Sequence, residues 1–338
     1  MKLIVRAPNW VGDAVMALPA VDNARDITGA SHIAVMARKA TAPLFKNHPD
    51  VDRIVVIDDQ SSRLAGPKKA AAMIKSDQYD IGLILPSSFS SALIFRLAGV
   101  AGRIGYAGDK RSFLLSRAIK PPGGEVHRAR CYLYLLEQLT GKTLSFRPPR
   151  VYLDHENIAA GEAALSEYSL SYDDRYVAVA PRAVAESRRW GTENYGRLCK
   201  RLIEKYECRI VLIGTGDDNM AGEEVRAGNE KRIINLCGRT DLMAAAAILS
   251  FANLFIGNDS GLAHLAGAVN CPLVVLSGPD NPAETSPLTD NKKVIIKDID
   301  CIKCVKNVCP KTGDDFMRCM KLITVDEVSD AAAEIFRD

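Results

Sequence analysis

The first loop suited to chemistry follows the first apolar run of the chain. That run ends at Arg6, and the next residues read Ala-Pro-Asn-Trp-Val-Gly-Asp, ending at Asp13. Gly12 permits a tight turn, so a helix is expected to begin close to Asp13. Considered alone, Asp13 is explained by the helix dipole, which an acidic residue there stabilises by about 0.3–1 kcal/mol. The loop lacks a G-x-G-x-x-G string, so it is not a dinucleotide fingerprint.

Three similar loops follow apolar runs in the second half of the chain, at 181–190, 214–218 and 258–264. Small residues at a helix start leave backbone N–H groups free for phosphate oxygens. Arg188 or Arg189 can add a bidentate clamp on the same phosphates, and Asp217 can accept hydrogen bonds from ribose hydroxyls. Helix capping by Ser260 and solvated arginines explain any one loop. The three loops together predict a nucleotide diphosphate site.

Short apolar runs alternate with helix-period segments along the chain, which is typical of βαβ units and a parallel sheet. Strands are expected at 3–6, 33–36, 53–57, 81–85, 176–180, 210–213, 232–235, 254–257 and 273–276. Helices are expected at 13–25, 67–75, 90–97, 127–139, 194–206, 218–226, 242–249 and 261–268. The stretch 145–150, with Pro148 and Pro149, has the composition of a linker.

These elements predict an α/β protein with two doubly wound domains. The N-terminal domain is expected at residues 1–150 and the C-terminal domain at 151–323. Thr324 and Glu327 have capping-box spacing, so 324–338 is expected to form a terminal helix, and its packing back on the N-terminal domain is left open. Two such domains place the carboxyl ends of their strands on a shared cleft, where open α/β sheets bind ligands.

The composition excludes several classes of protein. The chain has 338 residues, of which 47% are hydrophobic and 25% charged, so it is globular rather than disordered. With 44 Lys and Arg against 41 Asp and Glu, the net charge of +3 is too small for bulk nucleic-acid binding. The longest stretch without these charges, 260–279, is interrupted by proline and glycine, and no signal peptide is recognisable. A cytoplasmic monomer is expected.

The residues of these loops resemble glycosyltransferase family 9, the ADP-heptose:lipopolysaccharide heptosyltransferases. The resemblance spans nearly the whole chain and rests on Asn9-Trp10-Val11-Gly12-Asp13, Arg188-Arg189-Trp190, Asn258-Asp259-Ser260-Gly261-Leu262-x-His264 and Gly278-Pro279-x-x-Pro282. The Trp-Val-Gly-Asp form and the cysteine-rich tail resemble heptosyltransferase II more than heptosyltransferase I. The resemblance implies a GT-B fold of two Rossmann-like domains facing a cleft, an inverting mechanism without a required cofactor, and transfer of heptose from ADP-heptose to the lipopolysaccharide inner core.

The resemblance also implies roles for individual residues. The family's general base corresponds to Asp13, and ADP would be held by the second domain. The family usually has Lys-Arg/His-Trp where this chain has Arg188-Arg189-Trp190, so either arginine can meet the pyrophosphate. The acid that contacts the ribose would be Asp217 or Asp218. The expected donor-binding residues are Arg188, Arg189, Thr215, Gly216, Asp217, Asp259, Ser260, Gly261, Leu262 and His264.

A basic stretch at 96–130 is the candidate acceptor side. It carries eight Lys or Arg against Asp109 and Glu125, a net charge of +6 over 35 residues. A solvated face explains such a run. Attraction to a phosphorylated lipid-sugar acceptor, and to anionic headgroups at the inner face of the cytoplasmic membrane, explains it equally. The expected acceptor-binding residues are Asn9, Trp10, Arg103 and Arg128.

Four of the nine cysteines lie close together in the tail, and these are Cys301, Cys304, Cys309 and Cys319. A Cys-x2-Cys pair is a usual half-site for zinc, and four thiolates typically form a structural site. The x4 and x9 gaps are less usual, and an iron–sulfur cluster or reduced thiols are the alternatives. Because the resembling enzymes carry similar cysteines, a structural role is expected, with zinc as the candidate metal.

Two other functions stay open on the sequence alone. One is a GT-B sugar-nucleotide epimerase, which needs a second acid or base in the donor domain, and His264 is the candidate for it. The other is a sugar-nucleotide-binding protein without catalysis. Since function belongs to the site rather than to the fold, a shared fold does not separate these functions from a transferase.

Overall fold

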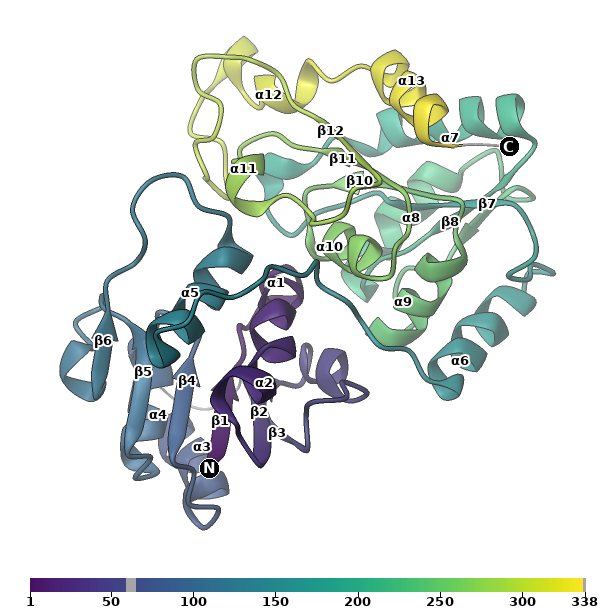
Figure 1. Ribbon diagram of the computed structural model, residues 1–338. Coiled ribbons are helices and arrows are strands. Elements are labelled where there is room, and N and C mark those ends of the chain that lie inside the picture. Colours follow the sequence, from purple (N-terminus) through teal and green to yellow (C-terminus); the bar gives the residue numbers. More distant parts are fainter. Residues whose placement is uncertain (59–64, 337–338) are drawn as a thin grey trace. The chain divides into compact units, whose positions relative to one another are not determined.

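The computed structural model of the chain describes residues 1–58 and 65–336. These residues form two compact units, Met1–Tyr152 and Leu153–Asp338, each with its own parallel sheet (Figure 1). Strands alternate with helices in both units, so the predicted α/β class with two doubly wound sheets is confirmed.

The first unit contains a six-stranded parallel sheet in the order β3-β2-β1-β4-β5-β6. Its strands are β1 (Lys2–Arg6), β2 (His32–Arg38), β3 (Arg53–Ile57), β4 (Ile81–Ile84), β5 (Gly102–Tyr106) and β6 (Arg117–Ile119). Val5 lies in register with Val35 on one side and Leu83 on the other. The chain winds in one direction from β1 to β3 and in the other from β4 to β6. The loops after β1 and β4 therefore flank the switch point, where open sheets bind ligands.

Helices and single turns connect the strands of the first unit. They are α1 (Val11–Asp22), α2 (Ala24–Thr28), η1 (Ala42–Phe45), α3 (Ala65–Lys75), α4 (Phe89–Leu97), η2 (Ser112–Leu114) and α5 (Arg128–Thr140). α1 packs against α5, and α3 packs against α4. Ile4, Ile84 and Phe95 are fully buried in one apolar cluster between sheet and helices. Gly82 is needed beside Phe95, because an added Cβ would overlap the aromatic ring.

The second unit contains another six-stranded parallel sheet, in the order β12-β11-β10-β7-β8-β9. Its strands are β7 (Tyr176–Ala180), β8 (Arg209–Leu212), β9 (Ile233–Asn235), β10 (Leu254–Asn258), β11 (Leu273–Leu276) and β12 (Lys292–Ile295). Val179 lies in register with Ile256 and with Leu212. Every residue of β7, β10 and β11 is buried, which explains their uninterrupted apolar character. Here the loops after β7 and β10 flank the switch point.

The helices and turns of the second unit include a terminal helix that packs within this unit. They are α6 (His155–Ser166), η3 (Glu186–Arg188), α7 (Thr192–Tyr206), η4 (Gly216–Asp218), α8 (Asn219–Arg226), α9 (Leu242–Phe251), α10 (Gly261–Ala268), α11 (Pro282–Thr285), η5 (Gly313–Asp315), α12 (Arg318–Lys321) and α13 (Val325–Ile335). A capping box between Thr324 and Glu327 opens α13. α13 contacts α7, β11 and β12, and Val328 and Ala332 are fully buried in their core.

The regular elements that were not predicted from the sequence include β5, β6, β12 and α6. β5 contains two glycines and Arg103, and β6 and β12 are edge strands that begin with Arg117 and Lys292. Their charged or flexible residues hide the strand pattern. None of the helices in the two described ranges is both long and apolar enough to cross a membrane.

Candidate active site

The loop after β10 presents polar groups at the carboxyl edge of the second sheet. Asp259 directly follows the strand, and its side chain is buried. Ser260 precedes α10, but its side chain makes no capping hydrogen bond, so the expectation that it caps this helix is wrong. The first amides of a helix, here those of Gly261 and Leu262, have no partner within the helix. The hydroxyl and these amides are suited to hold an anion.

Asp259 shares the interior with a second acid, Asp280, from the loop after β11. Asp280 is paired at both oxygens with Arg188, with 2.6 Å from Oδ2 to Nε and 2.6 Å from Oδ1 to Nη2. Burial raises the pKa of Asp259 to about 7, and repulsion from Asp280 adds to this, while Arg188 and Lys292 oppose it. In the described part of the chain, Oδ2 of Asp259 is buried without a hydrogen-bond partner. The site therefore takes up or releases a proton near neutral pH.

His264 completes this group of buried residues. It lies in α10, and its Nε2 is 3.8 Å from Oδ1 of Asp259. Both side chains are only 6% exposed. The structure thus brings Arg188, Asp259 and His264 of the predicted donor set together at one place. This place, which also contains Asp280, is here called the acidic site.

The two adjacent arginines of the loop after β7 have different partners. Arg189 donates from Nε to the carbonyl of Ala183 at 2.9 Å and from Nη2 to that of Val184 at 3.2 Å, so it braces its own loop. Arg188 instead contacts buried Asp280. Trp190 anchors the loop, since its indole donates to the carbonyl of Ile323 at 2.8 Å inside the core. Between the two candidates, Arg188 is therefore the arginine in the acidic site.

The two neighbouring acids in the loop after β8, Asp217 and Asp218, also have different partners. The Oδ2 of Asp218 accepts hydrogen bonds from the amide and the hydroxyl of Thr215, both at 2.8 Å, and these bonds open η4 at Gly216. Asp217 is exposed, and its carbonyl accepts a bond from Arg182 at 2.6 Å. Asp218 and Thr215 thus shape the loop, whereas the carboxylate of Asp217 faces solvent.

Asp13 lies in the first turn of α1, in the loop region after β1. Its Oδ1 is 3.2 Å from Nη1 of Arg128 and accepts a long bond from the hydroxyl of Tyr132 at 3.5 Å. Burial, the largest single effect, lowers the pKa of Arg128, but Asp13, Tyr132 and Cys131 together outweigh it and the net shift is upward. Burial raises the pKa of Tyr132 well above its usual value, and Asp13 raises it further. A carboxylate, a cation and a neutral phenol therefore meet at the carboxyl edge of the first sheet.

The other predicted acceptor residues differ in what they contact. Asn9 accepts a hydrogen bond from the buried guanidinium of Arg6. Trp10 is 65% exposed, so its indole is open to a ligand. Arg103 donates to three main-chain carbonyls of its own loop region at 2.6 to 3.0 Å, which fixes the turn around β5. Binding of an acceptor by these residues stays a prediction.

The four clustered cysteines line one small cavity of about 40 Å³. Across residues 1–58 and 65–336, however, no group of three or more His, Cys, Asp or Glu side chains is arranged to hold a metal ion. The structure therefore gives no support to the expected zinc site. The cysteine-rich segment instead contacts the acidic site's loops: Ser187 donates from its amide to the carbonyl of Asn307 at 3.1 Å, and Val305 donates to that of Pro279 at 2.8 Å. The segment thus braces the loops that carry Arg188 and Asp280.

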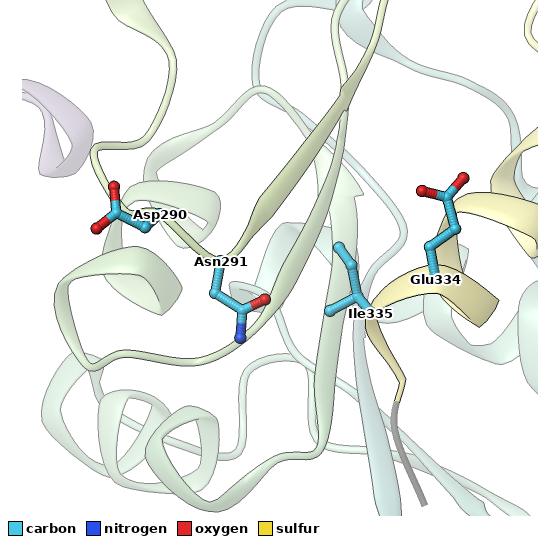
Figure 2. Close-up of a pocket in the computed structure, with 4 residues that line it drawn as sticks. All are labelled: Asp290, Asn291, Glu334 and Ile335. Atoms are coloured by element: carbon cyan, nitrogen blue, oxygen red, sulfur yellow. The ribbon is translucent and has the colours of Figure 1, made fainter.

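Another cavity, of about 350 Å³, lies elsewhere in the second unit (Figure 2). It is lined by Asp290, Asn291, Glu334 and Ile335. Because Asn291 immediately precedes β12, this cavity is at the amino end of that strand. The loops after β7 and β10 leave the opposite edge of the sheet, so the cavity is not part of the acidic site.

Sequence reasoning missed Asp280, which pairs with Arg188 in the acidic site, and Lys292, whose charge acts on Asp259 from the amino end of β12. Asp280 lies inside the Gly278-Pro279-x-x-Pro282 string that was recognised as a motif, and its place after an apolar run could have marked it. Lys292 begins β12, a strand that was not predicted. Burial lowers the pKa of Lys292, while the nearby charge of Asp259 opposes that shift.

Two doubly wound units, the second with an arginine and buried acids at the carboxyl edge of its sheet, are the architecture of a GT-B glycosyltransferase. Residues 68–313 match the family model for glycosyltransferase family 9 (heptosyltransferase). The chain belongs to this family and is a glycosyltransferase.

Relatives are similar over nearly the whole chain. It is 31% identical to lipooligosaccharide heptosyltransferase 2 of Haemophilus ducreyi, over 89% of each chain. It is 29% identical to lipopolysaccharide heptosyltransferase 2 of Escherichia coli K12, over 87% of this chain and 88% of that enzyme. The solved structure of E. coli ADP-heptose lps heptosyltransferase II is similar with a TM-score of 0.83 and 26% identity, over 99% of this chain and 98% of the other.

Proposed function

We propose that this glycosyltransferase moves heptose from ADP-heptose to the inner core of lipopolysaccharide, as a heptosyltransferase II. The observation that carries the proposal is the similarity, over almost nine-tenths of the chain, to enzymes named lipopolysaccharide or lipooligosaccharide heptosyltransferase 2. A motif shared by chance would not extend through both doubly wound units.

In this proposal the second unit holds ADP. Three features support the assignment: the guanidinium of Arg188, which pairs with buried Asp280, the first amides of α10 after Ser260, and the exposed carboxylate of Asp217. The amides and Arg188 would meet the diphosphate. Asp217 would accept hydrogen bonds from the ribose. Asp259 would stay protonated beside the diphosphate, because a neighbouring anion raises the pKa of a buried acid further.

Asp13 is the proposed general base. An acceptor hydroxyl attacks the anomeric carbon of the heptose, the bond from that carbon to the β-phosphate oxygen breaks, and ADP leaves with the electron pair. The hydroxyl proton passes to the carboxylate of Asp13, and the configuration at the anomeric carbon inverts. Arg128 orients this carboxylate through Oδ1. Arg188 and the α10 amides stabilise the negative charge that grows on the departing diphosphate, and no step uses a cofactor.

The acceptor in this proposal is a phosphorylated core sugar carried by a lipid at the membrane surface. The net charge of +6 over residues 96–130 supports an anionic acceptor. Trp10, with its open indole, would contact the sugar, and Arg128 would lie between the acceptor and Asp13.

The test is ADP release by the purified protein with ADP-heptose and delipidated core acceptors. We expect ADP to be released in proportion to the heptosylated product, and Asp13→Asn to abolish most of this release. A binding protein would take up ADP-heptose without releasing ADP, and an epimerase would change the sugar without an acceptor. Either result would contradict the proposal.

A further inference from the structure

The first unit exposes apolar side chains that its core does not use. Phe89 and Leu97, at the two ends of α4, are 38% and 41% exposed, and Phe113 in η2 is 74% exposed. Phe89, Leu93 and Leu97 are spaced four residues apart, so they share one face of α4. The rings of Phe89 and Phe113 lie against each other, with 6.1 Å between their centroids. Phe89 and Phe113 therefore form one exposed surface, here called the Phe89–Phe113 patch, and Leu97 adds exposed apolar area at the far end of α4.

The backbone under this patch is held firmly in place. The amide of Phe89 donates to Oδ2 of Asp109 at 2.6 Å, which joins the loop after β4 to the loop after β5. The buried guanidinium of Arg111 donates to the carbonyl of Pro86 at 2.6 Å and to that of Ser88 at 3.1 Å. Burial lowers the pKa of Arg111, which shows that its charged form is desolvated in the fold. The hydrogen bonds of this buried cation connect the two loops. An exposed patch on such a fixed base is suited to docking, because little order has to be gained on binding.

Exposed cations lie on or next to the elements that carry the patch. Arg96 lies on α4, Lys110 precedes η2 and Arg117 begins β6, and all three are exposed. In the part of the chain that the structure describes, none of the three has a recorded ion pair with an acid. Exposed aromatic rings amid unpaired cations match a bilayer with anionic headgroups, since the rings enter the interface and the cations meet the phosphates. A second copy of this chain is a poor partner for the patch, because the two basic surfaces would face and repel each other.

We propose that the Phe89–Phe113 patch docks the protein on a lipid bilayer that carries anionic headgroups. The inference rests on the proposed function, since it places the enzyme where a lipid-linked acceptor is found. Phe89 follows β4, Phe113 follows β5 and Asp13 follows β1, so all three lie in segments that leave the carboxyl edge of the same sheet. Docking through the patch therefore turns the catalytic edge of the first unit towards the membrane surface.

The first experiment is sedimentation of the purified full chain with vesicles. Vesicles of phosphatidylcholine alone are compared with vesicles that contain phosphatidylglycerol. We expect the protein to sediment with the anionic vesicles and to be released by salt. Phe89→Ser with Phe113→Ser should lower the partition coefficient at least tenfold. The matched control, Val184→Ser with Met220→Ser, changes side chains of the second unit that are 83% and 76% exposed, and it should bind as the wild type does.

A second comparison concerns charge. Lys110→Glu with Arg117→Glu should remove binding to the anionic vesicles, whereas Lys200→Glu with Lys231→Glu, an equal change of charge on the second unit, should reduce it much less. Thermal unfolding checks that each variant is folded. Wild-type protein that ignores anionic vesicles, or a Phe89/Phe113 variant that binds them fully, overturns the inference. A concentration-dependent dimer that this variant loses would assign the patch to self-association and overturn it as well.

Activity separates this inference from the proposed function. With a delipidated acceptor the Phe89/Phe113 variant should keep wild-type kcat and KM, and with an acceptor embedded in vesicles its KM should rise. If the protein binds vesicles but transfers heptose to no acceptor, the proposed function is contradicted and the docking surface is retained. If the Phe89/Phe113 variant and the wild type transfer heptose to the embedded acceptor with equal KM, the proposed function is kept and the docking surface is overturned.

Discussion

Asp13 and Arg128 form an ion pair across the first turns of α1 and α5, with 3.2 Å between Oδ1 and Nη1. The residues are 115 positions apart, and the packing of α1 on α5 brings them together. Their side chains are 21% and 45% exposed, so water weakens the pair and a ligand can reach both groups. Both the cation and the hydroxyl of Tyr132 approach Oδ1, which fixes the orientation of the carboxylate.

Replacing Asp13 tests the proposed base. Asp13→Asn keeps the shape of the side chain but cannot take the proton, so kcat should fall by about 10²–10⁴. ADP affinity should stay unchanged, because the proposed nucleotide site lies in the second unit. Steady-state ADP release and calorimetric ADP binding measure the two effects. Wild-type kcat in this variant would remove Asp13 from the mechanism.

Replacing Arg128 tests whether its guanidinium positions Asp13. Arg128→Ala should lower kcat/KM for the acceptor roughly tenfold, which corresponds to about 1.4 kcal/mol, and Arg128→Lys should restore part of the loss. The control is Arg130→Ala, two residues along α5, whose side chain lies over the ring of Phe146. Equal losses in the Arg128 and Arg130 variants would show a general effect of positive charge instead of a positioning role.

The buried Asp259 predicts a specific pH dependence of stability. Its pKa is about 7 in the folded chain and 3.8 for the free side chain. Between these values the folded protein keeps a proton that the unfolded chain has lost, so stability falls as pH rises through this range and the penalty is constant above about 7. Asp259→Asn removes the penalty, and its advantage in Tm over the wild type should therefore grow between pH 5 and pH 8.

The measurement can be confined to the second unit. The chain has two tryptophans, and in a Trp10→Phe background the fluorescence of buried Trp190 reports on the second unit alone. Asp217→Asn is the control, because that side chain is exposed and its loss should leave the pH profile of Tm unaltered. A pH-independent difference between Asp259→Asn and the wild type would contradict the upward shift.

The sequence was informative where strands are buried on both faces. The predicted ranges 176–180 and 273–276 coincide with β7 and β11, whose residues are all buried. Because catalytic loops follow such strands in a parallel sheet, Asp13, Arg188 and Asp259 could be found from their positions after apolar runs. Strands with few apolar residues gave no such signal, and β5, with Arg103 between glycines, was read as part of a basic loop.

Contacts between residues that are far apart in the chain could not be predicted from the sequence. Asp280 pairs with a residue 92 positions away, and no local pattern distinguishes Arg188 from Arg189. Only the turn of η3, which directs Arg188 to the buried acid and Arg189 to its own carbonyls, separates the two. The cysteine spacing predicted zinc, and the described residues give that prediction no support, since they form no set of metal ligands.

The pair of Arg188 and Asp280 supports a final prediction, in which a second substitution restores the Tm of the second unit but not its affinity for ADP. Arg188→Met removes the arginine that pairs with the buried carboxylate of Asp280, and loss of one member of a buried pair typically costs about 3–5 kcal/mol. Because Arg188 is 31% exposed, we expect a smaller loss, seen as a lower Tm of the second unit. Adding Asp280→Asn removes the buried negative charge and should recover most of the Tm. ADP affinity should stay low in the double variant, because the cation proposed to meet the diphosphate is still missing. Arg189→Met should keep ADP affinity near wild type, and a large loss there would transfer the phosphate role to Arg189.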